Sequence, residues 1–330
     1  MIRFCCKLLF VLASQANSVL ATDWIRAGLN TNQSVWGISG GLLWGVAPAG
    51  FRGGEPRGLI RLGYPVLEKG GYDLINFIAI EPIVRGRRGF SELERSPLDG
   101  VPGKKIWAEP GQSGVATELC PGECRRNEHG VEELELKLLV EKFDNGAHVR
   151  LVARQWSDKP GELELAVFKQ QDSEPLDSCI LTATMGNMAR ARLLWLKDRV
   201  VSSVQLYPNY KESGFAPHKE FGLSELHRNK DGDVLVAIST NEKSPATVYP
   251  FPGSDLWHYA GERVTQYWRV PAKVDTTLRA VVNGRFKYWR SDQPVPGGIA
   301  FENFELCESF HQGQTFVFGI TRAEPNKLGL

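Results

Sequence analysis

Residues 74–95, LINFIAIEPIVRGRRGFSELER, place one carboxylate, Glu81, inside an apolar run that is followed at once by Arg85, Arg87 and Arg88. A carboxylate in such a run needs a partner, because burial alone disfavours its charged form. Arginine suits that task, since its guanidinium can bind a carboxylate through two parallel hydrogen bonds. Three interpretations remain open here: a buried structural ion pair, a solvated loop, or a site for a polar ligand.

A second group of charges lies in FRGGEPRGLIRLGYP (51–65), where Arg57 and Arg61 stand among glycines. Glycine lets a ligand approach the backbone closely, and arginine binds anionic oxygens. Together with Glu81, these residues form either a network of ion pairs around a loop or a site for an acidic sugar or another anion. We expect Glu81 to orient an arginine rather than to act alone.

The densest set of groups that could transfer protons near neutral pH lies between residues 187 and 218. Asn187 and Arg190 follow a predicted strand, and Tyr210 and His218 stand in a loop interrupted by proline and glycine. A base, a phenol, a fixed cation and an amide are complementary in chemistry. We predict that these side chains converge on one face, although a loop histidine is equally at home on a plain surface.

Aromatic residues alternate with polar ones in GSDLWHYAGERVTQYWRVP, which contains Trp257, His258, Tyr267 and Trp268. Such side chains offer flat faces with a polar edge, which suits stacking on a sugar ring. They suit the corners of a β-sandwich equally well, where Tyr and Trp cover the core.

The late segment GGIAFENFELCESF contains Glu302. A strand with a period of two would place Glu302 on the same face as Phe304 and Leu306. Burial among apolar residues would then raise the pKa of the Glu302 carboxyl. The alternative is a carboxylate at the rim of a sheet.

Several other patterns exclude function classes. GISGG around Ser39 fits a nucleophile elbow in letters only, because no helical segment follows it. No phosphate loop, dinucleotide fingerprint or HExxH segment occurs, so we expect no nucleotide, cofactor or metal. CPGEC brings Cys120 and Cys124 close enough to predict a small disulfide loop rather than a metal site. The formal net charge of +1 gives no reason to expect nucleic acid.

Strand patterns dominate the chain. EELELKLLVEKF, AHVRLVARQW and ELELAVFKQ alternate polar and apolar residues and predict a three-stranded meander with an Asn145-Gly146 hairpin turn. Asp231-Gly232 and Asn283-Gly284 predict two further hairpins. We expect one helix, over residues 187–198. Further strands are predicted at 57–66, 73–84, 200–206, 264–270, 299–306 and 315–321.

These elements predict an all-β protein, a large antiparallel β-sandwich with few short helices. We expect a single domain over residues 22–330, with a long loop excursion at 96–130. Residues 1–21 have basic residues, a short apolar run and small residues ending at Ala21, which is typical of a signal peptide. The protein is therefore expected to be secreted or periplasmic, with no segment that spans a membrane.

The segments around His218, His258 and Glu302 (FAPH, LWHY and IAFENFEL) resemble the galactose-mutarotase-like supersandwich group of carbohydrate-active proteins. The resemblance covers roughly residues 130–320. It implies a sandwich whose concave face binds sugars. It also implies either epimerase-like proton transfer, by Glu302 with His218 or His258, or lyase-like proton abstraction, by Tyr210 or His218 with Arg190 and Asn187.

Two functional hypotheses follow. The first is an exported carbohydrate-active enzyme acting on a sugar or an acidic polysaccharide, as a polysaccharide lyase or a sugar epimerase. Its substrate would contact Arg190, Asn187, Trp257, Arg57, Arg61 and Glu81. The alternative is a non-catalytic glycan-binding or envelope structural protein that uses Trp257, Tyr267 and Trp268 as a platform. Both imply a carbohydrate ligand.

Overall fold

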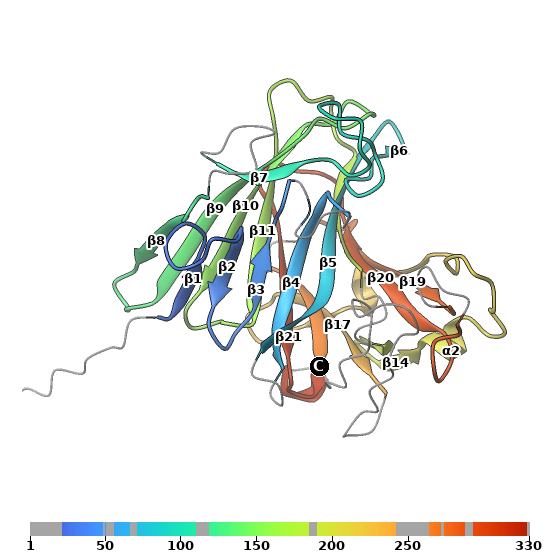
Figure 1. Cartoon of the computed structure of the whole chain (residues 1–330). Helices are drawn as coiled ribbons and strands as arrows, with labels where there is room; N and C mark the ends of the chain where they lie inside the picture. The colour runs from blue at the N-terminus through green and yellow to red at the C-terminus, as the bar shows by residue number, and fades with distance from the viewer. Residues whose placement is uncertain are drawn as a thin grey trace, which may run out of the picture.

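The computed structural model describes residues 22–48, 50, 56–66, 71–109, 119–184, 190–241, 264–271, 274–287 and 293–328. The predictions for the signal peptide at 1–21 and for Asn187, Trp257 and His258 lie outside the described residues. Two large sheets stack face to face and account for nearly all of the regular structure (Figure 1).

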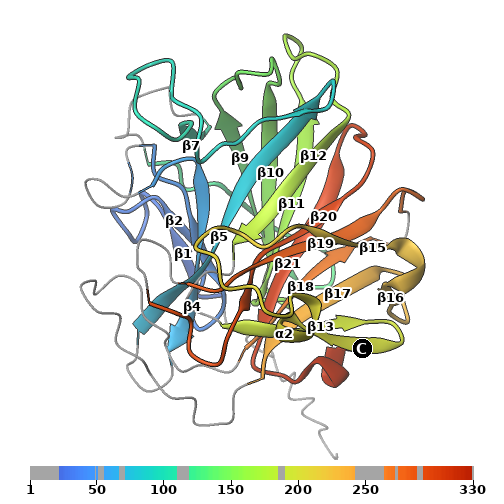
Figure 2. The same ribbon diagram turned by 90° about the vertical axis from the view of Figure 1, so that its right-hand side faces the viewer.

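The first sheet has 10 strands, all paired antiparallel. Its order is β1 (Trp24–Arg26), β2 (Val35–Ile38), β3 (Leu43–Gly45), β4 (Leu59–Val66), β5 (Gly71–Val84), β12 (Ser178–Thr184), β20 (Ala300–Cys307), β19 (Arg279–Arg285) and β15 (Lys219–Gly222), with β6 (Arg87–Arg88) beside β5. Figure 2 shows β5, β12, β20, β19 and β15 side by side. Strands from both ends of the chain thus form one surface.

The second sheet has 11 strands. Its order is β14 (Arg199–Ser202), β13 (Ala191–Leu196), β17 (Val234–Thr240), β18 (Thr265–Val270), β21 (Gln314–Thr321), β11 (Glu162–Lys169), β10 (Val149–Trp156), β9 (Glu132–Val140) and β7 (Ile106–Ala108), with β16 (His227–Arg228) beside β17 and β8 (Glu123–Arg126) beside β9. Helical structure in the described residues is short: α2 (Ser203–Leu206), η1 (Leu223–Glu225) and η2 (Pro325–Leu328). The prediction of an all-β sandwich with few short helices is confirmed.

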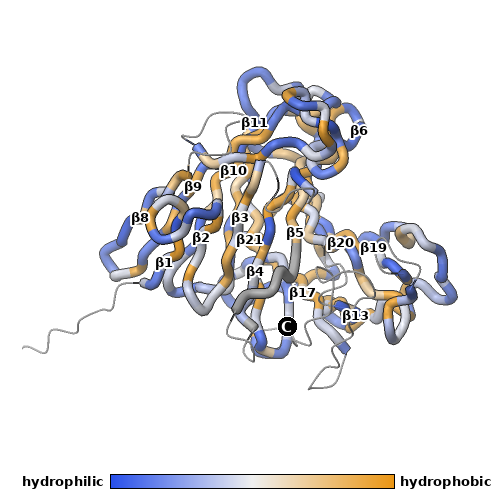
Figure 3. The backbone as a smooth tube through the Cα atoms, in the orientation of Figure 1, coloured by the Kyte–Doolittle hydropathy of each residue, from blue (hydrophilic) through white to orange (hydrophobic). Residues whose placement is uncertain are grey.

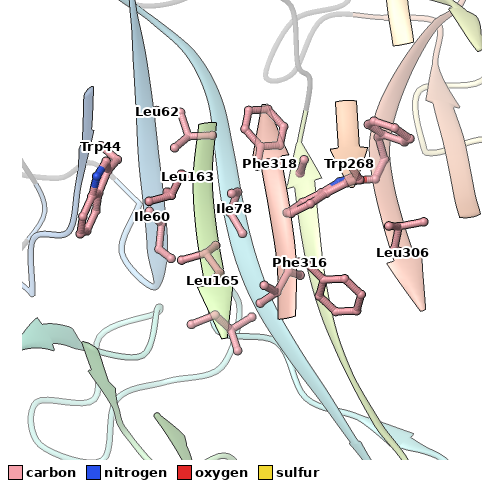
Figure 4. Packing of buried hydrophobic residues seen from close by; sticks show 14 of the residues in the cluster. Trp44, Ile60, Leu62, Ile78, Leu163, Leu165, Trp268, Leu306, Phe316 and Phe318 are labelled. Atoms are coloured by element: carbon pink, nitrogen blue, oxygen red, sulfur yellow. The ribbon is translucent and has the colours of Figure 1, made fainter. Parts of the chain in front are cut away.

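The core lies between the two sheets. Alternate residues of each strand point inward, as the period of two requires. Trp44, Ile60 and Ile78 of the first sheet face Leu163 and Phe316 of the second (Figure 4). The strands carry most of the hydrophobic positions, whereas the connecting loops are largely hydrophilic (Figure 3). One face of the first sheet is therefore committed to the core, and its other face is available for a site.

The predicted meander is confirmed as β9, β10 and β11. The Asn145-Gly146 turn connects β9 to β10, and the Asp231-Gly232 turn connects β16 to β17. The hairpin predicted at Asn283-Gly284 is wrong, because both residues lie inside β19. There the pair forms part of a bulge between β19 and β20, and the chain does not reverse direction.

The helix predicted at 187–198 is wrong as well. Residues 191–196 form β13, which pairs with β14 and β17. Its alanine, arginine and leucine residues favour a helix in isolation, but pairing with a strand on each side outweighs that preference. Part of the segment predicted as a strand at 200–206 is helical, since α2 begins at Ser203.

The predicted link between Cys120 and Cys124 is also wrong, because both cysteines are free. Cys120 is buried, and its thiol donates a hydrogen bond to the carbonyl of Glu109 at 2.8 Å. Cys124 is exposed on the edge strand β8. The excursion predicted at 96–130 contains β7 and β8, so part of it belongs to the second sheet. Within the described part of the chain, no helix has the length and apolarity needed to cross a membrane.

Candidate functional site

A pocket of about 240 Å³ opens on the outer face of the first sheet. Ile78 and Ile80 of β5 point into the core, so Phe77, Ala79 and Glu81 point the opposite way. The pocket is lined by Pro56, Leu59, Phe77, Ala79, Glu81, Phe90, Glu92, Leu93, Thr182, Thr184, Phe215, Arg285, Glu302 and Asn303. It thus combines carboxyl groups and one guanidinium with three phenyl rings.

A bulge between β19 and β20 directs Glu302 into this pocket. Phe304 pairs with Val282 and Phe301 pairs with Gly284, so Glu302 and Asn303 together face the single residue Asn283. The backbone N–H of Asn303 donates to the side-chain oxygen of Asn283 at 3.0 Å, which replaces a lost ladder contact. The prediction that Glu302 shares a face with Phe304 is therefore wrong. Phe304 lies in the core, and Glu302 lies on the outer face.

Glu302 is nearly inaccessible to solvent although it lines the pocket. Burial raises the pKa of its carboxyl to about 7, against the opposing effect of Arg285. The Nε of Arg285 lies 3.5 Å from the Glu302 Oε1. The neighbouring Glu92 also has a raised pKa because of burial. The predicted increase in the pKa of Glu302 is confirmed in direction and cause, and this carboxyl can hold a proton near neutral pH.

A second carboxyl group, Glu81, belongs to a cluster with Arg88, Thr182 and Glu305. The Nε of Arg88 donates to Glu81 at 2.6 Å, and its Nη2 donates to both Glu81 and Glu305, to the latter at 2.7 Å. Burial raises the pKa of Glu81 to about 7, with Arg88 opposing the increase and Glu305 adding to it. Glu81 does orient an arginine, as expected, and it also lines the pocket.

The hydroxyl of Thr182 contacts both carboxyl groups, the Oε2 of Glu81 at 2.9 Å and the Oε2 of Glu305. A hydroxyl has one proton to donate and can accept in return. Both contacts are therefore hydrogen bonds only when one of the two carboxyls carries a proton. Burial raises the pKa of Glu81 to about 7, so the cluster can hold this proton near neutral pH and release it at the pocket wall.

His218 lies at the edge of the same cluster. Its Nε2 is 3.8 Å from the Glu305 Oε1 and 3.3 Å from the amide nitrogen of Asn283. The ring is 45% exposed, whereas Glu305 is fully buried. That Oε1 atom makes no hydrogen bond to any described residue. His218 thus comes close to the acidic cluster without lining the pocket itself.

The other predicted site residues are spread out. Arg61 lies beside the pocket, with its guanidinium 5.4 Å from the centre of the Phe77 ring. Arg57 is outside the pocket wall and is held by Asp99 through two hydrogen bonds of 2.7 and 3.0 Å. Arg57 therefore belongs to a structural ion pair, as in the ion-pair network predicted as one of the two alternatives for residues 51–65.

Tyr210 and Arg190 do not line the pocket either. Tyr210 borders a separate shallow hollow formed by residues 206–212, 217 and 219. Arg190 is buried. Trp268 belongs to the core, and Tyr267 is buried with its hydroxyl 2.9 Å from Glu162, so neither can serve as a platform for a ligand. Of His218, Tyr210 and Arg190, only His218 lies at the edge of the acidic cluster, and none of the three lines the pocket.

Three residues of the site were missed by reasoning from sequence: Thr182, Arg285 and Glu305. A single apolar alternation pattern cannot reveal the bulge that brings Glu302 and Glu305 to the same face. Arg88 was noted in the opening cluster, but its partner Glu305 lies 217 positions away. Among the described residues, no group of three or more His, Cys, Asp or Glu side chains is arranged to hold a metal ion.

Comparison with known proteins adds no relative to this description. No family model, curated protein or solved structure matches the chain. The resemblance to the mutarotase-like supersandwich group therefore stays a prediction, and the site must be interpreted from its own geometry.

Proposed function

We propose that this protein is a carbohydrate-active enzyme that binds one neutral sugar ring in the pocket and transfers protons with Glu302 and Glu81. The observation that carries the proposal is the pair of buried carboxyls on β5 and β20, each with a pKa of about 7. The two strands flank β12, with Glu81 opposite Ile180 and Glu302 next to Asn303, which is opposite Thr184, and both glutamates line the same pocket.

The chemistry that fits best is cleavage of a glycosidic bond. Such cleavage uses two carboxyl groups, one that protonates the leaving oxygen and one that acts as a base or nucleophile. Glu302, protonated below about pH 7, would donate its proton to the leaving oxygen. Glu81, once its proton is released, would activate the water or stabilise the positive charge that develops on the ring. Arg88 and Thr182 would hold Glu81 in place.

The surroundings favour a neutral sugar over an acidic one. Arg285 faces Glu302, and Arg88 is divided between Glu81 and Glu305. Neither guanidinium is available to neutralise a uronate carboxylate without giving up an internal partner. Phe77, Phe90 and Phe215 supply flat apolar faces of the kind on which sugar rings stack. The expectation of an acidic polysaccharide therefore has less support than that of a neutral glycoside.

The test is a screen of neutral aryl glycosides and oligosaccharides, followed by E302Q. Removing a positioned general acid should lower turnover by about a hundredfold or more without loss of folding. E174Q, which changes an exposed carboxylate that does not line the pocket, is the matched control. Binding without turnover in the wild-type protein would favour a non-catalytic glycan-binding protein. Neither binding nor turnover across the panel would contradict both.

A further inference from the structure

The pocket continues outward into two exposed apolar side chains. Leu93 is 66% exposed and Phe215 is 50% exposed, and both also line the pocket. Single exposed apolar residues are ordinary on a protein surface. Here two of them, from segments far apart in the sequence, stand at the mouth of a pocket that contains several carboxyl groups. We refer to Leu93 and Phe215 as the apolar rim.

The segment that carries Leu93 is firmly attached to the sheet. Ser91 is fully buried, accepts a hydrogen bond from the backbone of Ile80 at 2.8 Å and donates one to the carbonyl of Gly58 at 2.6 Å. The backbone N–H of Leu93 donates to the carbonyl of Phe90 at 3.2 Å. Leu93 is therefore presented to solvent by a fixed turn.

Phe215 is held in place by contacts with β19. Its backbone bridges to Arg285, and the guanidinium of Arg285 lies 4.3 Å from the centre of its ring. The next residue, Ala216, donates from its backbone to the carbonyl of Gly284 at 2.7 Å. Arg285 also contacts Glu302, so the ring is attached to the wall that holds a carboxyl of the pocket.

We propose that the apolar rim binds a hydrophobic aglycone, an alkyl or aryl group attached to the anomeric oxygen of the sugar in the pocket. This inference rests on the proposed function and specifies its substrate class. A sugar in contact with the pocket carboxyls would leave its substituent between Leu93 and Phe215. Covering these two side chains would remove apolar surface from water, which favours an alkyl chain over a methyl group or a hydroxyl.

The experiment uses pairs of non-hydrolysable ligands, the octyl and methyl 1-thio-β-glycosides of glucose, galactose, mannose and N-acetylglucosamine. Their binding to the whole protein is measured by calorimetry below the micellar concentration of the octyl compounds. For the sugar that binds, the octyl compound should bind about tenfold more tightly than the methyl compound. That ratio corresponds to about two methylene groups taken out of water.

L93S should reduce this ratio by about threefold or more while leaving methyl glycoside binding nearly unchanged. F215S should reduce the ratio and weaken methyl glycoside binding as well, because Phe215 also offers a face to the sugar ring. L98S is the matched control, since Leu98 is 54% exposed on the same connection but does not line the pocket. Equal affinities of octyl and methyl compounds would overturn the inference and leave the proposed function intact. An equal loss in L98S would also overturn it, pointing to a wider protein-binding surface. Binding of no compound would contradict the proposed function itself.

Discussion

At the scale of single residues, the pocket depends on two carboxyl groups that hold protons unusually tightly. The pKa of Glu302 rises from the ordinary 4.5 to about 7 because the charged form is buried. Between these values the folded protein retains a proton that the unfolded chain has released. The free energy of unfolding therefore falls as the pH rises through this interval.

E302Q removes this dependence, because glutamine does not titrate. We compare the free energy of unfolding of E302Q with that of the wild-type protein at each pH. Between pH 5 and pH 8 this difference should shift in favour of E302Q by on the order of 3 kcal/mol. Urea unfolding at a series of pH values measures the difference. The exposed-site variant E174Q should follow the wild-type curve, and an E302Q curve parallel to the wild type would show that the Glu302 pKa is ordinary.

Arg88 is the residue on which the second cluster depends. R88M would retain most of the side-chain volume but leave Glu81 and the fully buried Glu305 without their cation. We expect the free energy of unfolding to fall by about 3 kcal/mol at pH 8. The loss should be smaller at pH 5, where Glu81 binds a proton in the folded state.

The same unfolding measurement on R85M provides the comparison. Arg85 is 80% exposed and paired with Glu174 at the surface. Exposed ion pairs contribute little, so R85M should be close to the wild-type protein. A similar loss in both variants would mean that the Arg88 cluster is worth no more than a surface pair.

At the scale of elements, the wall of the pocket is fixed where the 89–95 segment crosses the start of β4. Gly58 has φ of +73°, and a Cβ at that position would lie 1.8 Å from the carbonyl oxygen of Ser91. Only glycine allows this approach, which also gives Ser91 its contact with the Gly58 carbonyl.

G58A should lower the free energy of unfolding by about 3 kcal/mol or more and displace the segment that carries Leu93. Gly86 is the matched control, because its φ is also +73° but no atom lies within 4 Å of an added Cβ. G86A should cost only the backbone strain, about 1 kcal/mol. Thermal unfolding of both variants tests this, and equal shifts would show that the contact with Ser91 is unimportant.

At the scale of the whole molecule, the two sheets are joined by side chains that cross the core. Trp268 of the second sheet is fully buried and packs against Phe316 and Phe318, with ring centres 6.3 and 5.2 Å away. Its Nε1 donates to the carbonyl of Phe304 in the first sheet at 2.9 Å. The acceptor residue Phe304 lies in β20, the strand that also carries Glu302.

W268F should lower the free energy of unfolding by about 2 kcal/mol, through lost packing and the loss of the hydrogen bond to the Phe304 carbonyl. W195F is the control, since the Trp195 Nε1 bonds Ser239 within one sheet, outside the main core.

Far-UV circular dichroism and fluorescence should report the same transition in the wild-type protein. Separate transitions would show that the sheets unfold independently.

The sequence by itself determined the all-β class, most of the strands and the meander, because these depend on local alternation and on turn residues next to each other in the chain. It also singled out Glu81 and Glu302 as carboxyls in apolar surroundings. It misplaced the 187–198 segment, because strand pairing outweighs the helical preference of Ala191 and Leu193.

Only the tertiary structure decided which of these residues share a site. The Asn283-Gly284 pair has the same local signature as a true hairpin turn, yet its neighbours in β20 make it part of a bulge. That bulge reverses the face of Glu302, so that Glu302 shares the outer face of the sheet with Glu305. Contacts such as Arg88 with Glu305 join positions 217 residues apart. No local pattern contains that information, because it arises from the order of strands in the sheet.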